Sequence, residues 1–495
     1  MAGNAYHGGV TLPDRPEALP ASAHEASSAS SHFQPAHEAE AAASETEASV
    51  GSAATASARC ADRVPVGFGT NTAPTCRPAV MHPGVVTVNL DAIARNINTL
   101  RQRALGTELM AIVKADAYGH GLGPVSIAAL EAGATWLGVA QVSEALSLRA
   151  LLDQAGFSPT RAPILTWIAT PGTNWASLIT AHIDLAVSWT WVLDEICHAA
   201  HACGTRARIH IKVDTGMLRA GSTLEDLPAL AQAAAEAQRA GLVEIVGLFS
   251  HLSRADEPTP QGEASTMAHI QRFCDAQDIL RHAGIEPALC HLGASSGLLW
   301  HPDAHFDMVR PGIALYGLSP DPEVASGDEL GLWPALRLTS QLTSVKRAEA
   351  GQTVSYGGTW AAPTSRWLGL IPLGYADGIP RSASNQGAWV LIETAHGPLR
   401  ATQVGRICMD QFVVDLGSAE RGAPAPAAVG DTVVLIGDTR RVEPSADDWA
   451  RAAGTINYEI VTRLGDRLTR TWTRDSAMSD ATSTSDTTEG KPWTH

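Results

Sequence analysis

Lys114 is the residue that most directly suggests chemistry. It is one of only four lysines in 495 residues, and it directly follows the apolar run from Leu109 to Val113. That position places a primary amine at the end of a buried strand. Desolvation or nearby charge there would favour the neutral amine, which can form a Schiff base with a carbonyl group. A structural salt bridge at the strand end is an equally open interpretation from these residues alone.

More basic side chains lie at or just after other apolar runs of strand length. Lys212 lies near the end of the run 207–213, and Arg219 follows it in the next turn. His251 and Arg310 come shortly after two further runs. Clustered cations suit an anionic ligand. Taken singly, however, each residue has a structural explanation, such as a salt bridge or a hydrogen-bonded core histidine.

Two turns of small residues add a second signal. Residues 293–297 read Gly-Ala-Ser-Ser-Gly and contain Ser295, and Gly312 follows Arg310 after one proline. Small residues let backbone N–H groups approach phosphate oxygens closely. An ordinary loop is the alternative interpretation of each turn.

Tyr356 is a candidate base of another kind. It lies in Val354-Ser355-Tyr356-Gly357-Gly358, after an apolar stretch far along the chain. A phenol is a poor base at neutral pH, but neighbouring cations such as Arg219 and Arg310 would favour the phenolate and lower its pKa. A core aromatic residue with a satisfied hydroxyl is the structural alternative.

The elements that must position these residues follow a regular pattern. Eight apolar runs of strand length alternate with helical segments: 109–113, 136–140, 163–167, 183–187, 207–213, 243–249, 288–292 and 306–309. This alternation predicts a parallel (β/α)8 barrel of the TIM type over residues 81–330, with chemistry at the carboxyl ends of its strands. A doubly wound parallel sheet is the competing topology.

The pattern changes after residue 330. Strand-like segments separated by Gly, Pro and Asp predict a mostly β C-terminal domain over residues 331–474. Residues 1–80 and 475–495 are rich in small and polar residues, which predicts a disordered N-terminal extension and a disordered tail.

Composition excludes several classes of protein. The net charge of −16 argues against a nucleic-acid-binding surface. No apolar run is long enough for a transmembrane helix, and the N-terminus does not have the pattern of a secretory signal. Seven scattered cysteines predict reduced thiols in a cytoplasmic protein, and no metal site is expected.

Eight motifs, in order and spanning roughly residues 82–472, resemble those of alanine racemases. The first is the lysine motif Val-Lys-Ala-Asp-Ala-Tyr-Gly-His-Gly at residues 113–121. The others are Lys212–Met217, Phe249–Leu252, Val309–Gly317, Val354–Gly357, Gly374–Gly378, Gly405–Gln411 and Tyr458–Glu459.

The resemblance implies a pyridoxal 5'-phosphate-dependent homodimer that interconverts L- and D-alanine and supplies D-alanine for peptidoglycan. In that family, the lysine matching Lys114 holds the cofactor and acts as a base on one face of the substrate. The tyrosine matching Tyr356 acts on the opposite face and comes from the partner subunit.

The resemblance also implies roles for the residues around these two bases. Arg310 matches the arginine that contacts the pyridine nitrogen, and Lys212 matches a lysine that is carboxylated in many members. Cofactor-binding positions are matched by Tyr118, Arg219, His251, Ser295, Gly312, Ile313 and Tyr458, and substrate-binding positions by Arg219, Tyr375 and Met409.

Two departures from the family pattern affect the expected substrate. Ala294 stands where the family often has Asn, and Ala220 follows Arg219 where Leu is common. A racemase of broader specificity and a non-catalytic pyridoxal phosphate-binding protein therefore remain alternatives. The carriers lack the second domain, which argues against the latter. A related decarboxylase is disfavoured because no thiol motif of that family is matched.

Overall fold

The computed structural model describes residues 82–474, so both predicted disordered segments, 1–80 and 475–495, lie outside the described residues. Within this range no helix is long and apolar enough to cross a membrane. The first part contains eight parallel strands in the sheet order β8-β7-β6-β5-β4-β3-β2-β9. Their bounds are β2 Glu108–Ile112, β3 Trp136–Val139, β4 Ile164–Thr166, β5 Asp184–Val187, β6 Ala207–Lys212, β7 Val243–Phe249, β8 Leu289–His291 and β9 Met308–Val309.

The two end strands of this sheet lie close enough to make the barrel nearly closed. Asp307 N donates to Cys290 O at 3.0 Å, and Arg310 N donates to Gly293 O at 2.8 Å. The predicted TIM-type barrel is therefore confirmed, and the doubly wound alternative is wrong. Each predicted apolar run overlaps one of the eight strands.

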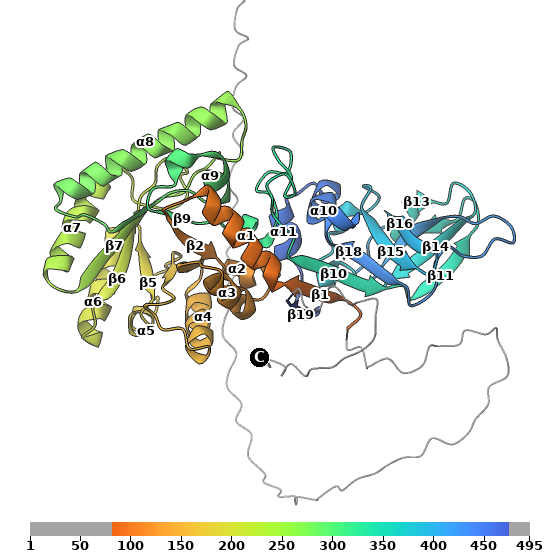
Figure 1. Cartoon of the computed structure of the whole chain (residues 1–495), viewed down its shortest axis with the longest axis horizontal. Helices are drawn as coiled ribbons and strands as arrows, with labels where there is room; N and C mark the ends of the chain where they lie inside the picture. Colours follow the sequence, from red (N-terminus) through yellow and green to blue (C-terminus); the bar gives the residue numbers. More distant parts are fainter. Residues whose placement is uncertain (1–81, 475–495) are drawn as a thin grey trace, which may run out of the picture. The chain divides into compact units, whose positions relative to one another are not determined.

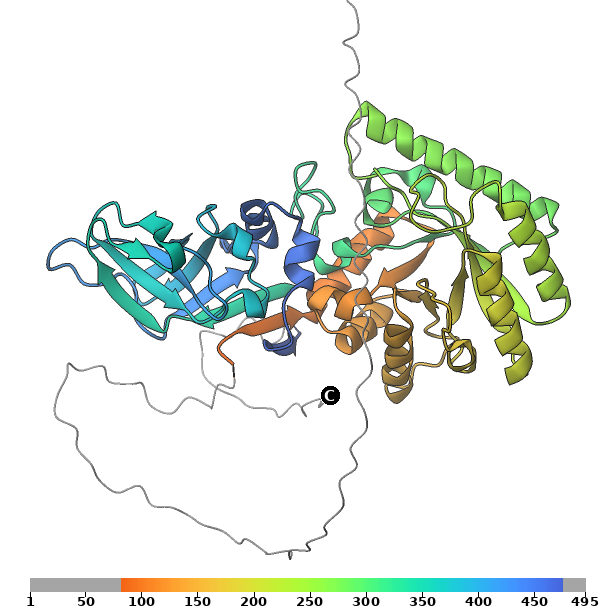
Figure 2. The ribbon, with the colours of Figure 1, turned by 180° about the vertical axis from the view of Figure 1, so that it is seen from behind.

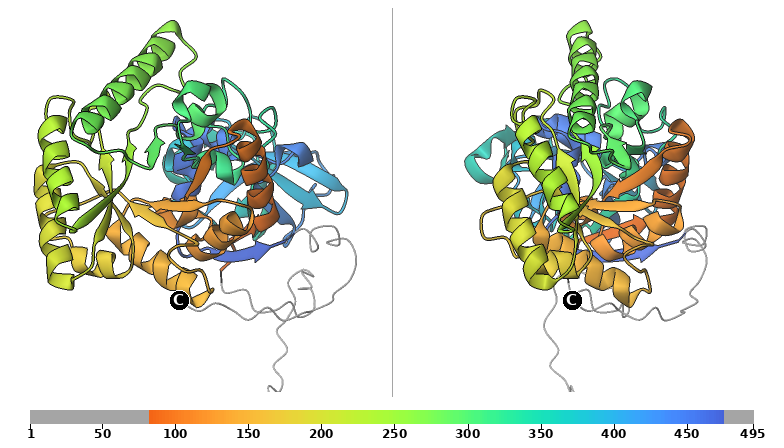
Figure 3. Two further views of the ribbon diagram at one scale, coloured as in Figure 1. Left: turned by 60° about the vertical axis from the view of Figure 1, so that its left-hand side comes forward. Right: turned by 90° about the vertical axis from the view of Figure 1, so that its left-hand side faces the viewer.

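Helices cover the outer face of the barrel, as Figures 1 and 3 show for α6, α7 and α8. The strands are buried on both faces, because helices cover the outer face and side chains fill the barrel on the inner face. This explains their continuous apolar runs. The helices are α1 Leu90–Arg103, α2 Lys114–Gly119, α3 Leu122–Glu131, α4 Val142–Gln154, α5 Trp175–Thr180, α6 Thr190–Cys203, α7 Leu227–Arg239, α8 Pro260–His282 and α9 Ser295–Trp300.

The second part is built on a mostly antiparallel nine-stranded sheet, ordered β11-β14-β17-β16-β15-β18-β10-β1-β19. Figure 2 shows these strands from the opposite side. Beyond β1, the bounds are β10 Leu336–Gln341, β11 Ser344–Ala348, β14 Arg366–Ile371, β15 Trp389–Thr394, β16 Gly397–Val404, β17 Phe412–Ser418, β18 Thr432–Ile436 and β19 Thr469–Thr473. A two-stranded sheet of β12 Thr353–Val354 and β13 Trp360–Ala361 and the helices α10 Ala446–Ala453 and α11 Asn457–Thr462 complete this part.

The first strand corrects the predicted domain limit. The sequence prediction placed residues 81–330 in the barrel, but β1 (Val85–Asn89) pairs antiparallel with β10 and parallel with β19 in the C-terminal sheet. Val86 and Val88 are fully buried, so the strand fills a place in that sheet's core. A local apolar pattern predicts a strand but not its partner, which is why the sequence could not assign this one.

Candidate active site

Lys114 begins an unusual turn at the carboxyl end of β2. The four residues after it, Ala115 to Tyr118, all have φ between 52° and 55°, which is the left-handed helical region. This conformation costs roughly 1–2 kcal/mol for each residue with a Cβ, so contacts must hold it. Glu144 Oε1 accepts from Ala115 N at 2.5 Å, and Asp116 Oδ1 accepts from Leu122 N at 2.7 Å.

The surroundings of Lys114 favour its neutral amine. Its Nζ lies 5.9 Å from the ring centre of Tyr118 and 5.8 Å from that of Trp167. Burial, and then the charge of Arg219, lower the pKa of Lys114, with Glu144 acting weakly in the opposite direction. Among residues 82–474 no carboxylate forms a salt bridge with it. The geometry therefore supports a nucleophilic amine rather than the structural salt bridge.

Lys212 lies in the same cationic surroundings at the end of β6. It is buried, with its Nζ 5.5 Å from the ring centre of Phe249. Burial, and then the charges of Arg219, Arg310 and Lys114, lower its pKa to about 8. A substantial fraction of this amine is thus neutral near physiological pH.

Arg310 is held firmly where β9 ends. Its Nη2 donates to Ser250 O at 2.6 Å and to Leu292 O at 3.0 Å, and its Nη1 donates to His291 Nδ1 at 3.1 Å. Burial lowers the pKa of Arg310 to about 9, which still leaves the guanidinium charged at neutral pH. Its charge and burial together lower the pKa of His251 well below the usual value, so that imidazole is neutral.

A cradle of small groups lies beside these cations. Ser295 Oγ accepts from Gly312 N at 2.9 Å and from Ala314 N at 3.4 Å. A Cβ on Gly312 would lie only 2.4 Å from Tyr118 Oη, so no larger residue fits without displacing that phenol. Burial raises the pKa of both Tyr118 and Tyr458, so both hydroxyls stay protonated and can donate hydrogen bonds.

Helix α11 brings Tyr458 to this cradle from the end of the chain. It packs on α2 so closely that a Cβ on Gly119, whose φ is 77°, would lie 2.4 Å from Val461 O. The ring centres of Tyr118 and Tyr458 are 6.2 Å apart. A glycine in the lysine motif thus allows the contact that completes the cavity.

These groups line one cavity of about 590 Å³ at the carboxyl end of the barrel. It contains ten of the predicted site residues: Lys114, Tyr118, Lys212, Arg219, His251, Ser295, Arg310, Gly312, Ile313 and Tyr458. Two lysines and two arginines beside the hydroxyl groups that line the cavity suit an anionic, phosphate-bearing ligand with a carbonyl for Lys114 to attack.

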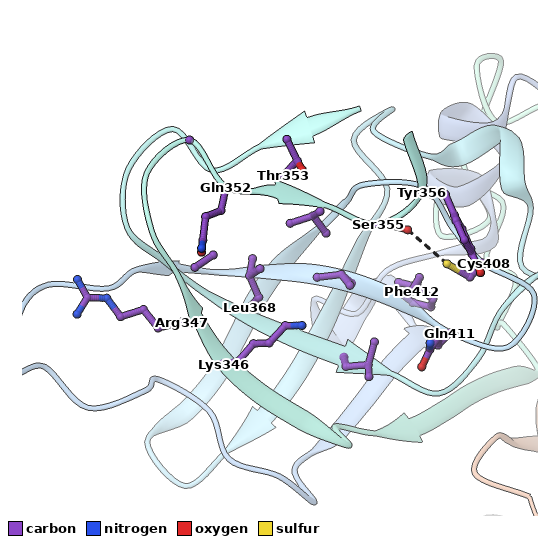
Figure 4. A pocket seen from close by; sticks show the side chains of 15 residues that line it. Lys346, Arg347, Gln352, Thr353, Ser355, Tyr356, Leu368, Cys408, Gln411 and Phe412 are labelled. Carbon is purple, nitrogen blue, oxygen red and sulfur yellow. Dashed lines mark hydrogen bonds between the residues drawn. The ribbon is translucent and has the colours of Figure 1, made fainter. Parts of the chain in front are cut away.

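The other three predicted residues lie outside this cavity. Tyr356 lines an open groove of about 900 Å³ in the β part, together with Cys408 and Phe412 (Figure 4). Tyr356, Tyr375 and Met409 keep 72%, 43% and 53% of their surface exposed. Tyr375 and Met409 belong to neighbouring loops, since Tyr375 N donates to Cys408 O at 3.0 Å. A single chain therefore does not bring Tyr356 to Lys114.

Two buried groups next to the site were not predicted as site residues. His291 contacts Arg310, and His210 contacts His291 with 3.0 Å between Nδ1 and Nε2. His210 interrupts the apolar residues of β6, and a polar residue between two isoleucines of a largely buried strand was the signal that could have identified it.

A near-closed parallel barrel whose first strand ends in a desolvated lysine, followed by a β domain, is the architecture of the barrel-type racemases. Residues 88–320 match the alanine racemase N-terminal domain, and residues 335–472 match the alanine racemase C-terminal domain. The chain therefore belongs to the alanine racemase family.

Individual relatives agree with this assignment. Alanine racemases of Beutenbergia cavernae and Frankia casuarinae are 49% and 46% identical, over 79% and 77% of this chain and 97% and 94% of their own length. The crystal structure of the alanine racemase from Streptomyces lavendulae is 44% identical with a TM-score of 0.73, covering 79% of this chain and 97% of that one. The protein is an alanine racemase, an isomerase that interconverts L- and D-alanine.

Proposed function

We propose that this racemase works with pyridoxal 5'-phosphate in the cavity around Lys114. The observation that carries the proposal is the convergence in that one cavity of the desolvated amine of Lys114, the basic side chains of Lys212, Arg219 and Arg310, and the Ser295–Gly312 cradle. When bound, the cofactor supplies an electron sink that acidifies the α-proton of the amino acid.

The phosphate would be held by the cradle. Ser295, Gly312, Ile313, Tyr118 and Tyr458 all line this cavity. The Ser295 hydroxyl, the two phenols and the backbone N–H group of Ile313 would donate to the phosphate. Arg310 would face the pyridine nitrogen. Because a guanidinium keeps its protons, it leaves that nitrogen largely unprotonated, which weakens the electron sink and limits side reactions such as transamination.

Racemisation needs a proton donor and acceptor on each face of the substrate. We propose that Lys114 serves one face and that Tyr356 of the partner subunit serves the other, so that one removes the α-proton while the other returns a proton from behind. The supporting observation is that Tyr356 is largely exposed in a single chain and belongs to a different cavity from Lys114.

Two further features concern the substrate. Arg219, which lines the cavity, would bind the substrate carboxylate, and a carbamate on Lys212 would give this arginine an anionic partner. Tyr375 and Met409 of the second chain would line the access to the site. Supply of D-alanine for peptidoglycan in the cytoplasm is the physiological role that fits this activity.

The direct test is a racemisation assay with added cofactor on alanine, serine, lysine and arginine. We expect alanine to be the preferred substrate. Comparable rates on the larger amino acids would favour the broader racemase, for which Ala294 in the cavity wall is the supporting feature. Lys114→Ala should abolish both turnover and the visible absorbance of the bound cofactor. An unchanged visible spectrum in Lys114→Ala would refute the cofactor assignment.

A further inference from the structure

A line of buried hydrogen bonds connects Arg310 to the opposite end of the barrel. From Arg310 Nη1 it passes to His291 Nδ1 at 3.1 Å, from His291 Nε2 to His210 Nδ1 at 3.0 Å, and from His210 Nε2 to Asp184 Oδ2 at 3.1 Å. Asp184, His210 and His291 are 0% exposed, and Arg310 is 6% exposed. Asp184 is the first residue of β5, so the line ends at the amino-terminal side, away from the catalytic cavity.

Donor and acceptor capacity fixes the direction of every bond in this line. A guanidinium can only donate, so His291 Nδ1 must accept. A neutral imidazole that accepts at one nitrogen carries its proton on the other, so His291 Nε2 donates to His210 Nδ1. By the same rule His210 Nε2 donates to Asp184. Burial and the charge of Arg310 lower the pKa of His291 well below its usual value, which agrees with a neutral ring.

The far end of the line imposes the same direction independently. Arg208 donates from Nε to Asp184 Oδ1 at 2.8 Å and from Nη2 to Oδ2 at 3.1 Å. A carboxylate paired in this way is ionised and can only accept hydrogen bonds. The two ends, one a pure donor and one a pure acceptor, therefore specify a single arrangement of protons.

Aromatic neighbours hold both rings in place. Phe249 stacks on His291 with ring centres 5.0 Å apart and an angle of 5°, and Trp136 meets His210 edge-on at 5.4 Å. Neither imidazole can therefore turn over without disturbing the packed core.

We infer that Asp184 and His210 are positioning residues for Arg310, because they fix the tautomers that present a lone pair, and not an N–H group, to its Nη1. The inference rests on the proposed role of Arg310 at the cofactor ring. It assigns a part in the reaction to residues at the end of the barrel that normally serves stability alone.

The substitution Asp184→Asn tests this logic. When the amide oxygen takes the Oδ1 position, it accepts from Arg208 Nε, and the new NH2 group replaces Oδ2, which faces both Arg208 Nη2 and His210 Nε2. His210 Nε2 must then accept. The protons of both histidines would move to the other nitrogen, and His291 Nδ1–H would face an Arg310 N–H group. Two opposed donors cannot bond, so Arg310 Nη1 would lose its partner. The opposite amide orientation would keep the wild-type tautomers, and kcat should then also stay unchanged.

Glu244→Gln is the matched control. Glu244 Oε1 also accepts from Arg208, at 3.2 Å, but the residue has no contact with the histidines. Both variants remove one negative charge beside the same arginine, and only Asp184→Asn changes the acceptor at the end of the line.

The measurement is the 15N spectrum of histidine-labelled, deuterated holoenzyme, with the two rings assigned from His210 and His291 variants. Wild type and Glu244→Gln should both show neutral rings protonated at Nε2, and Asp184→Asn should show protonation at Nδ1. We expect kcat for alanine to fall at least tenfold in Asp184→Asn and by less than twofold in Glu244→Gln.

Three results would overturn the inference. They are Nδ1 protonation or a charged ring in the wild type, an equal loss of kcat in both variants, and reversed tautomers with unchanged kcat. The wild-type spectrum decides even if Asp184→Asn does not fold. A wild-type protein without bound cofactor absorbance would instead refute the proposed function, and the tautomers would still be measured.

Discussion

Lys114 and Lys212 share one cavity, but their neighbours suit them to different chemistry. The charge of Arg219 lowers the pKa of both amines. For Lys114 it is opposed by Glu144, whereas for Lys212 it is joined by Arg310 and Lys114 and opposed by Asp214. Cations around an amine repel its protonated form and would attract the negative charge of a carbamate. Carbon dioxide reacts with the neutral amine to give a carbamate, so the lowered pKa of Lys212 favours this modification.

The expected consequence is a carbamate on Lys212 whose occupancy rises with pH. At pH 7 an amine with a pKa of about 8 is about 10% neutral, against less than about 0.1% for an unperturbed lysine. At fixed carbon dioxide pressure, occupancy should therefore increase as pH rises from 6 through 8. Carbon-13 NMR of protein equilibrated with 13C-labelled carbon dioxide would show the carbamate signal. Lys212→Arg keeps the charge without the reactive amine and should give none; a signal that persists in this variant lies on another residue.

Loss of the Tyr356 hydroxyl should slow α-proton removal from one enantiomer more than from the other. Tyr356→Phe keeps the ring but removes the acidic hydroxyl, so it should impair removal of the α-proton from the L-isomer at least 100-fold, on the scale of general acid–base catalysis. Removal from the D-isomer, which falls to Lys114 if Tyr356 acts on the L-isomer, should change much less. Deuterium exchange from each enantiomer in heavy water measures the two steps. Equal losses for both enantiomers would contradict the assignment of faces.

At the scale of elements, the left-handed turn, the Gly312 loop and α11 form the cradle together. Gly312 is the point at which they touch, because a Cβ there would meet Tyr118 Oη at 2.4 Å. Tyr118 cannot withdraw, since its ring packs against Tyr316 at 4.8 Å and is 6% exposed.

Gly312→Ala should therefore weaken cofactor binding more than it weakens the fold. Overpacking typically costs about 1–3 kcal/mol, which corresponds to roughly a 5- to 150-fold rise in the cofactor dissociation constant if it falls on binding. Fluorescence or absorbance titration of the apoenzyme measures that constant. Gly123→Ala is the control, since a Cβ on this residue of α3 would make only ordinary contacts of 3.4 and 3.9 Å with Leu151. A Gly312→Ala protein with normal affinity would show that the cradle does not hold the cofactor.

The same elements show how far the sequence predicts structure. The apolar runs predicted the barrel. Because a parallel barrel brings the carboxyl ends of its strands together on one face, they also predicted that Lys114, Lys212 and Arg310 line one cavity. The left-handed turn after Lys114 was not predictable, since Ala115 and Ala117 carry no preference for positive φ and only tertiary contacts impose it. The partner of β1 was equally hidden, because its choice between two sheets depends on residues more than 200 positions away.

At the scale of the whole molecule, the separation of Lys114 from Tyr356 has a direct consequence. If the second base comes from another chain, a dimer holds two sites, each with one lysine from one subunit and one tyrosine from the other. The groove beside Tyr356, with Met409 and Tyr375 exposed nearby, would then face the partner's barrel.

Hybrid dimers, which combine two different variant subunits, test this arrangement and do not require an active enzyme to be dissociated into monomers. Lys114→Ala and Tyr356→Phe homodimers each lack one base in both of their sites and should be nearly inactive. In a mixed dimer, one site combines Lys114 of the Tyr356→Phe subunit with Tyr356 of the Lys114→Ala subunit, so it is complete. The other site lacks both bases.

Coexpression of the two variants with different affinity tags, followed by sequential purification, isolates the mixed dimer. Its racemase activity should be about half that of wild type per dimer, since one of two sites is complete, and its cofactor content should be about half as well. If each chain instead completed its own site, neither subunit of the mixed dimer would have both bases, and the activity would stay at the level of the parent variants. Tagged wild-type dimers taken through the same steps set the full-activity reference, so a recovery near one half can arise only from a site shared between two chains.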